Sequence, residues 1–501
     1  METENKGIIY RFLNAIEVAG NRMLDPISIF FLLCVAVVLL SGILAYFGTS
    51  AIHPKDGSIV DVVNLLNKGE LQRYISSIIG SFQSFPPMAL VLVVMIGVGV
   101  AEKSGLMDAA LHRAVSNIPK IAVTPVVIFL GILSNVAGDA GFIVLPPLSA
   151  LVFLSVGRHP LIGLFASFGG VAAGFAANIM IGLSDVLAAS FTIPAAQLID
   201  SSYEATPAMN YYFIIVSSFI LTIVGTIVTE KVIAPRYEGD AFDKSKKERI
   251  VSSDIEVKGL KYAAVVFIAL VALLIILCLG DKPFLGDNNG SILGVNSPLM
   301  KGMIPIITIL FLVPGLVFGK VAGTIKKDRD AVRMMGKSMS EMGPYIVLAF
   351  FASQFLALFA FSNLGIILAI KGSDLLRSIG FTGGGLLTGF IIFAAFVNLF
   401  IGSASAKWAI LAPIFVPMFL LLGYDPALTQ MAYRIGDSVT NPLSPLFPYL
   451  PVLLSYISVY KKDSGLGTVV SNMLPYSFSF FITWTILLLI WFYASLPLGP
   501  R

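Results

Sequence analysis

The sequence has little charge and few of the side chains that bind metals or form disulfides. Only 12% of its 501 residues are Asp, Glu, Lys or Arg, too few to cover the surface of a soluble protein of this length. We expect the three histidines, His53, His112 and His159, to lie in loops, which supports neither a metal cluster nor a Ser-His-Asp arrangement. The two cysteines, Cys34 and Cys278, lie inside apolar runs and are interpreted as buried hydrophobic residues. We therefore expect no cofactor, no metal centre beyond a bound Na⁺, and no nucleic-acid partner.

Apolar runs of membrane-spanning or near-spanning length are abundant. Hydrophobic residues make up 57% of the chain, and a helix needs roughly 20 residues to cross a bilayer. The polar N-terminus has no cleavable signal pattern, so we expect the first run to remain in the membrane. The clear predicted spans are Pro26–Phe47, Pro86–Ala101, Met209–Val232, Leu260–Leu279, Met303–Val317, Tyr345–Phe361 and Met473–Tyr493.

The basic residues predict the orientation of these spans. Most of the 33 lysines and arginines fall in segments that we place in the cytoplasm, namely 1–25, 102–120, Arg158, 231–261, 319–343 and 461–472. Far fewer fall in the segments that we place outside, namely 48–85, 190–208, 280–302, 363–384, 423–427 and the C-terminus. The N-terminus is therefore predicted to be cytoplasmic.

Three regions interrupted by Gly, Pro, Asn or charge complete the topology: 121–156, 160–190 and 385–460. Both ends of 121–156 are predicted to be cytoplasmic, so this region must enter and return as a hairpin, and 160–190 must then cross outward. By the same logic 385–422 enters from outside and returns there, and 428–460 crosses inward. The prediction is an all-α polytopic membrane protein with nine transmembrane helices and two re-entrant helical hairpins.

The two hairpin regions resemble each other. The first reads NVAGDAGFIVLPPLSALVFLSVGRHP, and the second reads NLFIGSASAKWAILAPIFVPMFLLLGYDP. Each begins with Asn, continues through a small-residue turn and a proline-bearing apolar run, and ends in Gly-x-x-Pro. Each precedes a segment predicted to be a broken helix, FGGVAAGFAANIMIGLSDV or YRIGDSVTNPLSPLFPYLP. Related halves that enter from opposite faces form an inverted-topology repeat, which in secondary transporters places substrate and ion sites between discontinuous helices.

This pattern divides the chain into five parts. We predict a first scaffold over 1–120, a first hairpin and broken-helix repeat over 121–232, and a central scaffold over 233–361. A second repeat follows over 385–460, and the last span lies within 473–501.

The chain resembles the AbgT family of p-aminobenzoyl-glutamate transporters, and more distantly the ion-transporter superfamily. The resemblance rests on SNVAGDAGFIVLPPL, GSASAKWAILAPIFVPM, YRIGDSVTNPLSP and the spacing between them. It implies a homodimer in the inner membrane that moves p-aminobenzoyl-glutamate or related folate catabolites, coupled to Na⁺ or H⁺, with sulfonamide export in some members. It also implies a substrate-region role for residues in the matching motifs: Asp185, Asn398, Ser405, Trp408, Pro426, Arg434, Asp437 and Pro445.

Buried charges are the strongest site candidates, because a charge at membrane depth is costly. Asp437 and Arg434 lie one helical turn apart, and they are interpreted either as ion and substrate ligands or as a structural ion pair. Asp185 has no basic residue near it in the sequence, and it is either an ion ligand or a residue near the outer interface. Asp139 is predicted to lie at the first hairpin tip and to be an ion-coupling residue. A helix break is predicted after it, at Pro146 and Pro147.

Other polar and aromatic residues are weaker candidates. We predict ion-coupling roles for Asn135 and Asn178, and hydrogen bonding by Ser403. Trp408 is predicted to stack on the aromatic ring of a substrate, whereas Trp484 and Trp491 are predicted to be interfacial anchors. For Lys407, snorkelling and contact with an anion both stay open.

An intramembrane aspartyl protease is a competing hypothesis, since GYDPAL and RIGD echo its motifs. That chemistry needs two facing aspartates that share a proton, and neither VAGD nor RIGD contains the first glycine of a GxGD motif. A passive channel is a third hypothesis. The sequence leaves the direction of transport and the coupling ion open.

Overall fold

The computed structural model describes residues 26–52, 57–115, 119–137, 140–237, 253–288, 290–292, 297–444, 447–462 and 464–500. Two predicted site residues, Asp139 and Pro445, lie outside these ranges, as does His53. Within them the chain is helical, apart from one short antiparallel hairpin of β1 (Ser50–Ile52) and β2 (Ile59–Asp61). This hairpin corrects the prediction of a purely α-helical chain.

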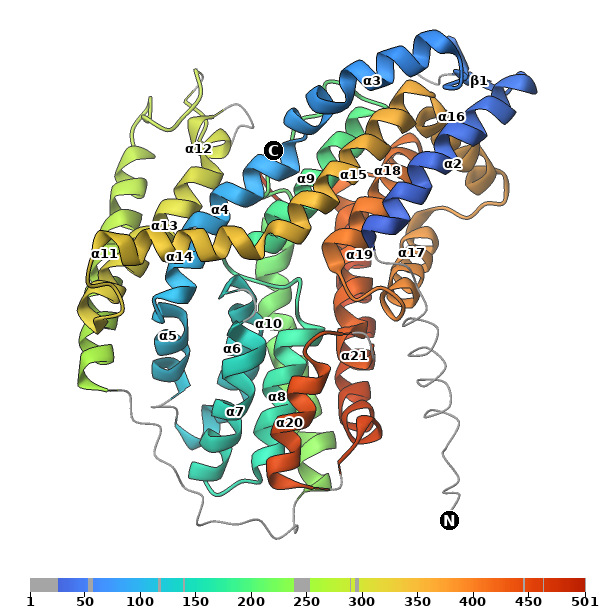
Figure 1. Cartoon of the computed structure of the whole chain (residues 1–501). Helices are drawn as coiled ribbons and strands as arrows, with labels where there is room; N and C mark the ends of the chain where they lie inside the picture. The colour runs from blue at the N-terminus through green and yellow to red at the C-terminus, as the bar shows by residue number, and fades with distance from the viewer. Residues whose placement is uncertain are drawn as a thin grey trace.

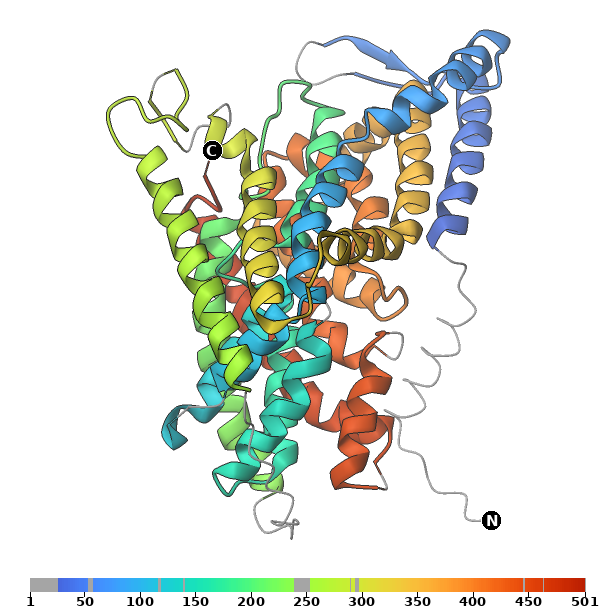
Figure 2. The ribbon, with the colours of Figure 1, turned by 60° about the vertical axis from the view of Figure 1, so that its left-hand side comes forward.

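Two groups of helices flank the repeats, on opposite sides of the molecule (Figures 1 and 2). On one side α11 (Asp254–Leu277) packs along α13 (Met303–Ala322). On the other side α2 (Pro26–Tyr46) packs on α15 (Gly343–Phe361). The remaining flanking elements are α3 (Lys68–Gln83), α4 (Pro86–Lys103), α5 (Leu106–Val115), α12 (Pro298–Lys301), α14 (Asp328–Glu341) and α16 (Leu364–Ser378).

Every clear predicted span is a helix, and two of these helices begin well before the predicted residue. The spans predicted to start at Leu260 and Met473 begin earlier, at Asp254 and Leu466. Ser253 explains the first shift, because its hydroxyl accepts a hydrogen bond from the Glu256 amide at 3.2 Å in a capping box. Among the described residues eight helices are long and apolar enough to cross a membrane, and the eighth is α18 (Ala404–Leu421) in the second hairpin region.

The two hairpin regions fold with the same order of elements. The first contains η1 (Lys120–Ala122), α6 (Val123–Ser134), η2 (Asn135–Ala137), α7 (Ala140–Ser155), α8 (Pro160–Phe168), η3 (Gly169–Ala173), α9 (Leu183–Gln197) and α10 (Tyr211–Val228), extended by η4 (Thr229–Ile233) and η5 (Ala234–Arg236). The second contains α17 (Gly383–Asn398), α18, α19 (Pro426–Thr440), η7 (Asn441–Leu443), α20 (Leu450–Tyr460) and α21 (Leu466–Tyr493). We name these segments the first and the second repeat.

The helix breaks lie elsewhere than predicted. Helix α7 runs through Pro146 and Pro147 without interruption, so the predicted break there is wrong. In the first repeat the α-helix is instead interrupted by the π-turn η3 and the irregular residues 174–182. In the second repeat the helix ends after η7. Neighbouring helices can re-satisfy the carbonyl that a proline leaves free, which lets a membrane helix continue through it.

Close backbone approaches explain several small residues. In α19 a Cβ at Gly436 would lie 2.4 Å from the carbonyl oxygen of Ile391 in α17, so these helices meet at a distance that only glycine allows. At the first hairpin tip a Cβ at Gly141 would lie 2.3 Å from the hydroxyl of Ser134. The glycines therefore bring the two arms of the first hairpin together, and they bring α17 against α19.

Three predicted environments are wrong. His112 lies in α5 rather than in a loop. Ser190 is buried in α9, where the sequence predicted the start of an exposed outer segment, and α9 continues to Gln197. Trp484 is fully buried, and its indole nitrogen donates to the hydroxyl of Ser217 at 2.8 Å, so it joins α21 to α10 instead of anchoring the interface.

Candidate functional site

The irregular segment of the first repeat lies against α19 of the second. The hydroxyl of Ser438 accepts from the Ala176 amide at 3.1 Å, and the amide of Asn441 donates to the carbonyl of Ala172 at 3.3 Å. Asn178 binds the same segment from within, since its side-chain oxygen accepts from the Ile179 amide at 2.8 Å. Side chains therefore satisfy backbone groups that a break inside a membrane protein would otherwise leave unpaired.

An ion pair joins the two repeats at this contact. A guanidinium nitrogen of Arg434 in α19 lies 2.7 Å from a carboxylate oxygen of Asp185 in the first turn of α9. The second oxygen of Asp185 accepts from the Gly182 amide at 2.8 Å, which caps α9. Both side chains are almost completely buried. Asp185 thus has a basic partner that lies far away in the sequence, and it lies in the interior instead of near an interface.

A second ion pair lies within the second repeat. The ammonium nitrogen of Lys407 in α18 lies 2.5 Å from a carboxylate oxygen of Asp437 in α19. The same ammonium donates to the side-chain oxygen of Asn398, the last residue of α17. The Asn398 amide in turn donates to the Asp437 carbonyl at 2.6 Å. Lys407 therefore contacts an anion and does not snorkel, and the ion pair between Arg434 and Asp437 that the sequence left open does not form.

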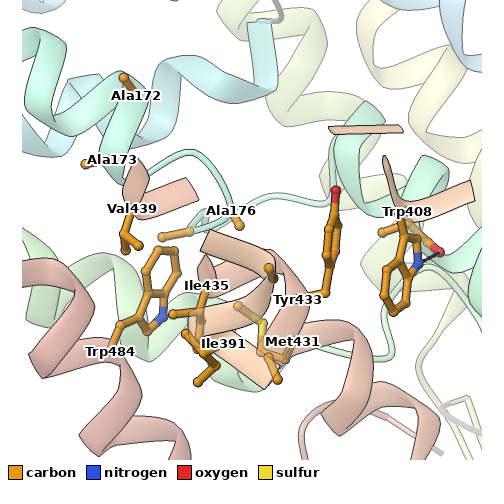
Figure 3. Packing of buried hydrophobic residues seen from close by; sticks show 14 of the residues in the cluster. Ala172, Ala173, Ala176, Ile391, Trp408, Met431, Tyr433, Ile435, Val439 and Trp484 are labelled. Carbon is orange, nitrogen blue, oxygen red and sulfur yellow. Dashed lines mark hydrogen bonds between the residues drawn. The ribbon is translucent and has the colours of Figure 1, made fainter. Parts of the chain in front are cut away.

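Two aromatic rings lie beside the second ion pair. Trp408 and Tyr433 stack with ring centroids 4.4 Å apart and an angle of 19° between their planes. Figure 3 shows the two rings facing each other, with Trp484 on the other side of α19. The Tyr433 hydroxyl donates to the Ala404 carbonyl at 2.6 Å, next to Ser405. Trp408 is only 1% exposed, so in this conformation Tyr433 occupies the stacking position that the sequence predicts for a substrate ring.

A buried polar chain holds the indole of Trp408 in place. Its nitrogen donates to the Thr192 hydroxyl at 2.9 Å, and that hydroxyl lies 2.6 Å from the side-chain oxygen of Gln430. The Gln430 amide donates to the side-chain oxygen of Asn210, whose own amide donates to the Ala427 carbonyl at 2.8 Å. The chain connects α18, α9, α19 and α10.

Sequence reasoning missed Thr192, Asn210, Gln430 and Tyr433. A signal for two of them was present in α19. Gln430, Tyr433, Arg434 and Asp437 recur at spacings of three and four residues, which places them on one face of a helix. Thr192 and Asn210 carry no such pattern, because each is a single polar residue in an otherwise apolar or irregular stretch.

The remaining candidates are distributed around this centre. Asn135 donates to the carbonyls of Ile132 and Val171, each at 3.1 Å, while its buried side-chain oxygen has no hydrogen-bond partner among the described residues. Ser403 is the N-cap of α18 and accepts from the Ala406 amide at 3.4 Å. Ser405 lies within 3.3 Å of the Ser403 hydroxyl, and both are accessible at the hairpin tip. Pro426 is the first residue of α19 and is buried.

The model of the AbgT putative transporter family matches residues 11–501. The chain belongs to this family. It is also 36% identical to the p-aminobenzoyl-glutamate transport protein of Escherichia coli K12 over 489 residues, which cover 97% of this chain and 95% of that protein. It is therefore a multi-pass membrane transporter and not an enzyme.

Two solved structures have the same fold. The YdaH transporter of Alcanivorax borkumensis superimposes with a TM-score of 0.92 at 36% identity, covering 95% of this chain and all of that one. MtrF of Neisseria gonorrhoeae superimposes with a TM-score of 0.91 at 41% identity, covering 98% of this chain and all of that one. MtrF is described as representing a class of antimetabolite efflux pumps.

Proposed function

We propose that this chain is a secondary active transporter of p-aminobenzoyl-glutamate or related aromatic carboxylates, coupled to Na⁺ or H⁺. The observation that carries the proposal is the buried Arg434–Asp185 pair, which joins α19 of one repeat to α9 of the other. A guanidinium fork matches a carboxylate bidentately, so a substrate carboxylate is the natural competitor for Asp185. The substrate named for the E. coli relative has carboxylates in its glutamate moiety and an aromatic ring.

The surrounding residues supply the rest of a binding site for such a molecule. The first turn of α18 begins at the accessible hydroxyls of Ser403 and Ser405, and a helix N-terminus favours a second carboxylate. The stacked rings of Trp408 and Tyr433 lie one turn further along. In this mechanism the stack opens, and the aromatic ring of the substrate takes the place of one partner.

The proposed topology follows from the charge pattern and the order of the elements. The α6–α7 and α17–α18 hairpins are the re-entrant pair, and α8–α9 and α19–α20 are broken crossings. With the long apolar helices they give nine crossings in an inverted-topology repeat. The positive-inside bias supports a cytoplasmic N-terminus, and membership of the family supports a location in the inner membrane.

Ion coupling is proposed for the carboxylates and amides at the contact between the repeats. Asp185 is a negative group that a cation can neutralise when Arg434 moves away, whereas Asp437 already has the Lys407 ammonium as its cation. The unpartnered side-chain oxygen of Asn135 is a ligand that a Na⁺ ion prefers. Asn178 caps the irregular backbone nearby and keeps its carbonyls in position.

Transport into proteoliposomes tests the proposal. Purified protein should accumulate p-aminobenzoyl-glutamate against its gradient when a Na⁺ or a H⁺ gradient is imposed separately, and imposing each gradient in both directions distinguishes uptake from efflux. Arg434→Lys keeps the charge but loses the fork, so it should weaken apparent affinity by about tenfold or more. Arg329→Lys on exposed α14 is the matched control. Equilibration without accumulation would identify a passive channel instead.

Among the described residues, the two aspartates that suggested a protease do not share a proton. Asp425 in GYDPAL caps the start of α19 by accepting from the Ala427 amide at 2.8 Å, and Asp437 in RIGD lies near the other end of that helix and pairs with Lys407.

We also propose a homodimer, which the family resemblance implies. The apolar outer face of α11 is largely exposed in the single chain, as contact with lipid or with a second copy requires. Native mass spectrometry in mild detergent should show two copies, and monomers alone would contradict the proposal.

A further inference from the structure

Lys407 is one of the most deeply buried side chains of the molecule, and its surroundings are those of a bound cation. Its side chain is 0% exposed, and that of Asp437 is 4% exposed. The ammonium contacts one carboxylate oxygen of Asp437 and the amide oxygen of Asn398. Carboxylate and amide oxygens are the ligands that hard cations take in proteins. The ammonium of Lys407 in α18 therefore lies against oxygen atoms from two other helices, the end of α17 and one face of α19.

A purely structural role does not explain a lysine at this place. Burying an ion pair costs desolvation energy for both groups, and a well-packed apolar pair often serves stability as well or better. Lys407 also lies at the end of the first turn of α18, where the helix dipole favours negative charge. A positive charge is therefore unfavourable at this position, and only the oxygen atoms of Asn398 and Asp437 compensate for it.

The first repeat provides an internal comparison. Asn135 begins η2 directly after the first arm of its hairpin, just as Asn398 ends the first arm of the second. In the second repeat the first turn of the helix that follows contains Lys407, whereas the first turn of α7 in the first repeat, Ala140–Ile143, contains no charged residue. Correspondingly, the side-chain oxygen of Asn398 accepts a hydrogen bond from the Lys407 ammonium, while that of Asn135 accepts no hydrogen bond within the described part of the chain.

We propose that the Lys407 ammonium is a tethered cation, which fills an ion site built by Asn398 and Asp437 that a dissolved Na⁺ would otherwise occupy. The inference deepens the proposed ion-coupled transport and rests on it for its physiological meaning. The charge at this site then stays with the protein throughout the transport cycle. Removing the ammonium should create a vacant site that binds Na⁺ from solution.

Thermal unfolding of the purified full-length protein tests this without any transported substrate. Melting temperatures are measured in NaCl and in choline chloride at constant ionic strength, for wild type, Lys407→Ala and the double variant Lys407→Ala/Asp437→Asn. Lys371→Ala removes an exposed lysine of α16 and is the matched control. Lys407→Ala should melt lower than wild type in choline chloride, and its melting temperature should rise with the logarithm of the Na⁺ concentration.

The comparison with the other variants decides the outcome. The extra response to Na⁺ should be absent from wild type, from Lys371→Ala and from the double variant, which lacks the carboxylate ligand. Ethylammonium should also raise the melting temperature of Lys407→Ala, because it returns the missing group. A response of Lys407→Ala no larger than that of wild type, or an equal response of the double variant, would overturn the proposal.

A variant that does not fold also gives an answer. Lys407→Met keeps most of the apolar stem and is measured beside Lys407→Ala. If both are folded only in Na⁺, the proposal is supported, and if neither folds in either salt, a mobile cation does not replace the ammonium and the proposal fails. Because no substrate is present, these results hold whether or not the protein moves p-aminobenzoyl-glutamate.

Discussion

The Arg434–Asp185 pair can be tested by a double-mutant cycle. Arg434→Met removes the guanidinium and keeps an apolar side chain of similar length. Asp185→Asn removes the charge and keeps an oxygen that can accept from the Gly182 amide, so the cap of α9 survives. The double variant contains neither charge. Transport activity and stability are measured for all four proteins.

The burial of the pair determines how much stability each substitution should cost. The Arg434 and Asp185 side chains are 5% and 1% exposed, and they lie 2.7 Å apart. Removing one partner leaves an uncompensated buried charge, which costs about 3–5 kcal/mol. Removing both leaves no such charge, so the double variant should lose much less stability than the sum of the two single effects, which is about 6–10 kcal/mol.

A second cycle distinguishes this pairing from the one expected from sequence spacing. Arg434→Met combined with Asp437→Asn leaves Asp185 and Lys407 both unpaired, so the two effects should add, with little coupling. Melting temperature in detergent ranks the variants, and surface expression is measured in parallel. Strong coupling in this second cycle, with none in the first, would refute the pairing described here.

The two cycles also separate structure from transport. If Arg434 binds the substrate carboxylate, the Arg434→Met/Asp185→Asn variant should recover stability but remain inactive. Near wild-type transport by this variant would leave the pair a purely structural role.

Three further predictions concern other parts of the molecule. Trp408→Phe keeps the stack but removes the indole donor, so it should destabilise the protein by about 1–3 kcal/mol, measured by thermal unfolding. Gly436→Ala should lower the melting temperature markedly, because its Cβ would lie 2.4 Å from a carbonyl oxygen, whereas Gly336→Ala in α14 meets nothing within 4 Å and should be neutral or stabilising. In a background without native cysteines, a cysteine at Asp287 should be labelled only from outside and one at Lys326 only from the cytoplasm. The reverse labelling would overturn the proposed topology.

The fold was largely predictable, because its determinants are local in the sequence. Apolar length identifies the spans, and the repeated Asn, small-residue and Gly-x-x-Pro pattern identifies both hairpin regions. The position of the helix breaks was not predictable from proline alone. Pro146 and Pro147 lie inside a continuous helix, and the break falls at Gly169–Ala173 and beyond, where the contact with α19 supplies hydrogen bonds to the backbone.

The candidate site was predictable in its residue types but not in its contacts. Arg434, Asp437, Asp185 and Trp408 all lie near one another around α19, and the sequence selected each of them. Their partners were not predictable from the sequence, because each buried side chain pairs with the element packed against it and not with its neighbour along the chain. Arg434 faces the first repeat, and Asp437, three residues later, faces Lys407 of the second hairpin.

The two pairings lead to a prediction about coupling stoichiometry. Both ion pairs are neutral, so a substrate carboxylate that takes Arg434 leaves Asp185 buried and uncompensated, at a cost of several kcal/mol. A Na⁺ ion or a proton at Asp185 removes that cost, whereas Asp437 keeps its tethered partner Lys407 and needs no ion. We therefore expect one coupling cation for each substrate carboxylate held by Arg434. The ratio of labelled substrate to cation flux in proteoliposomes measures it. One cation carried per substrate by wild type, and two per substrate by Lys407→Ala, would fit this assignment. Substrate flux with no accompanying cation would contradict it.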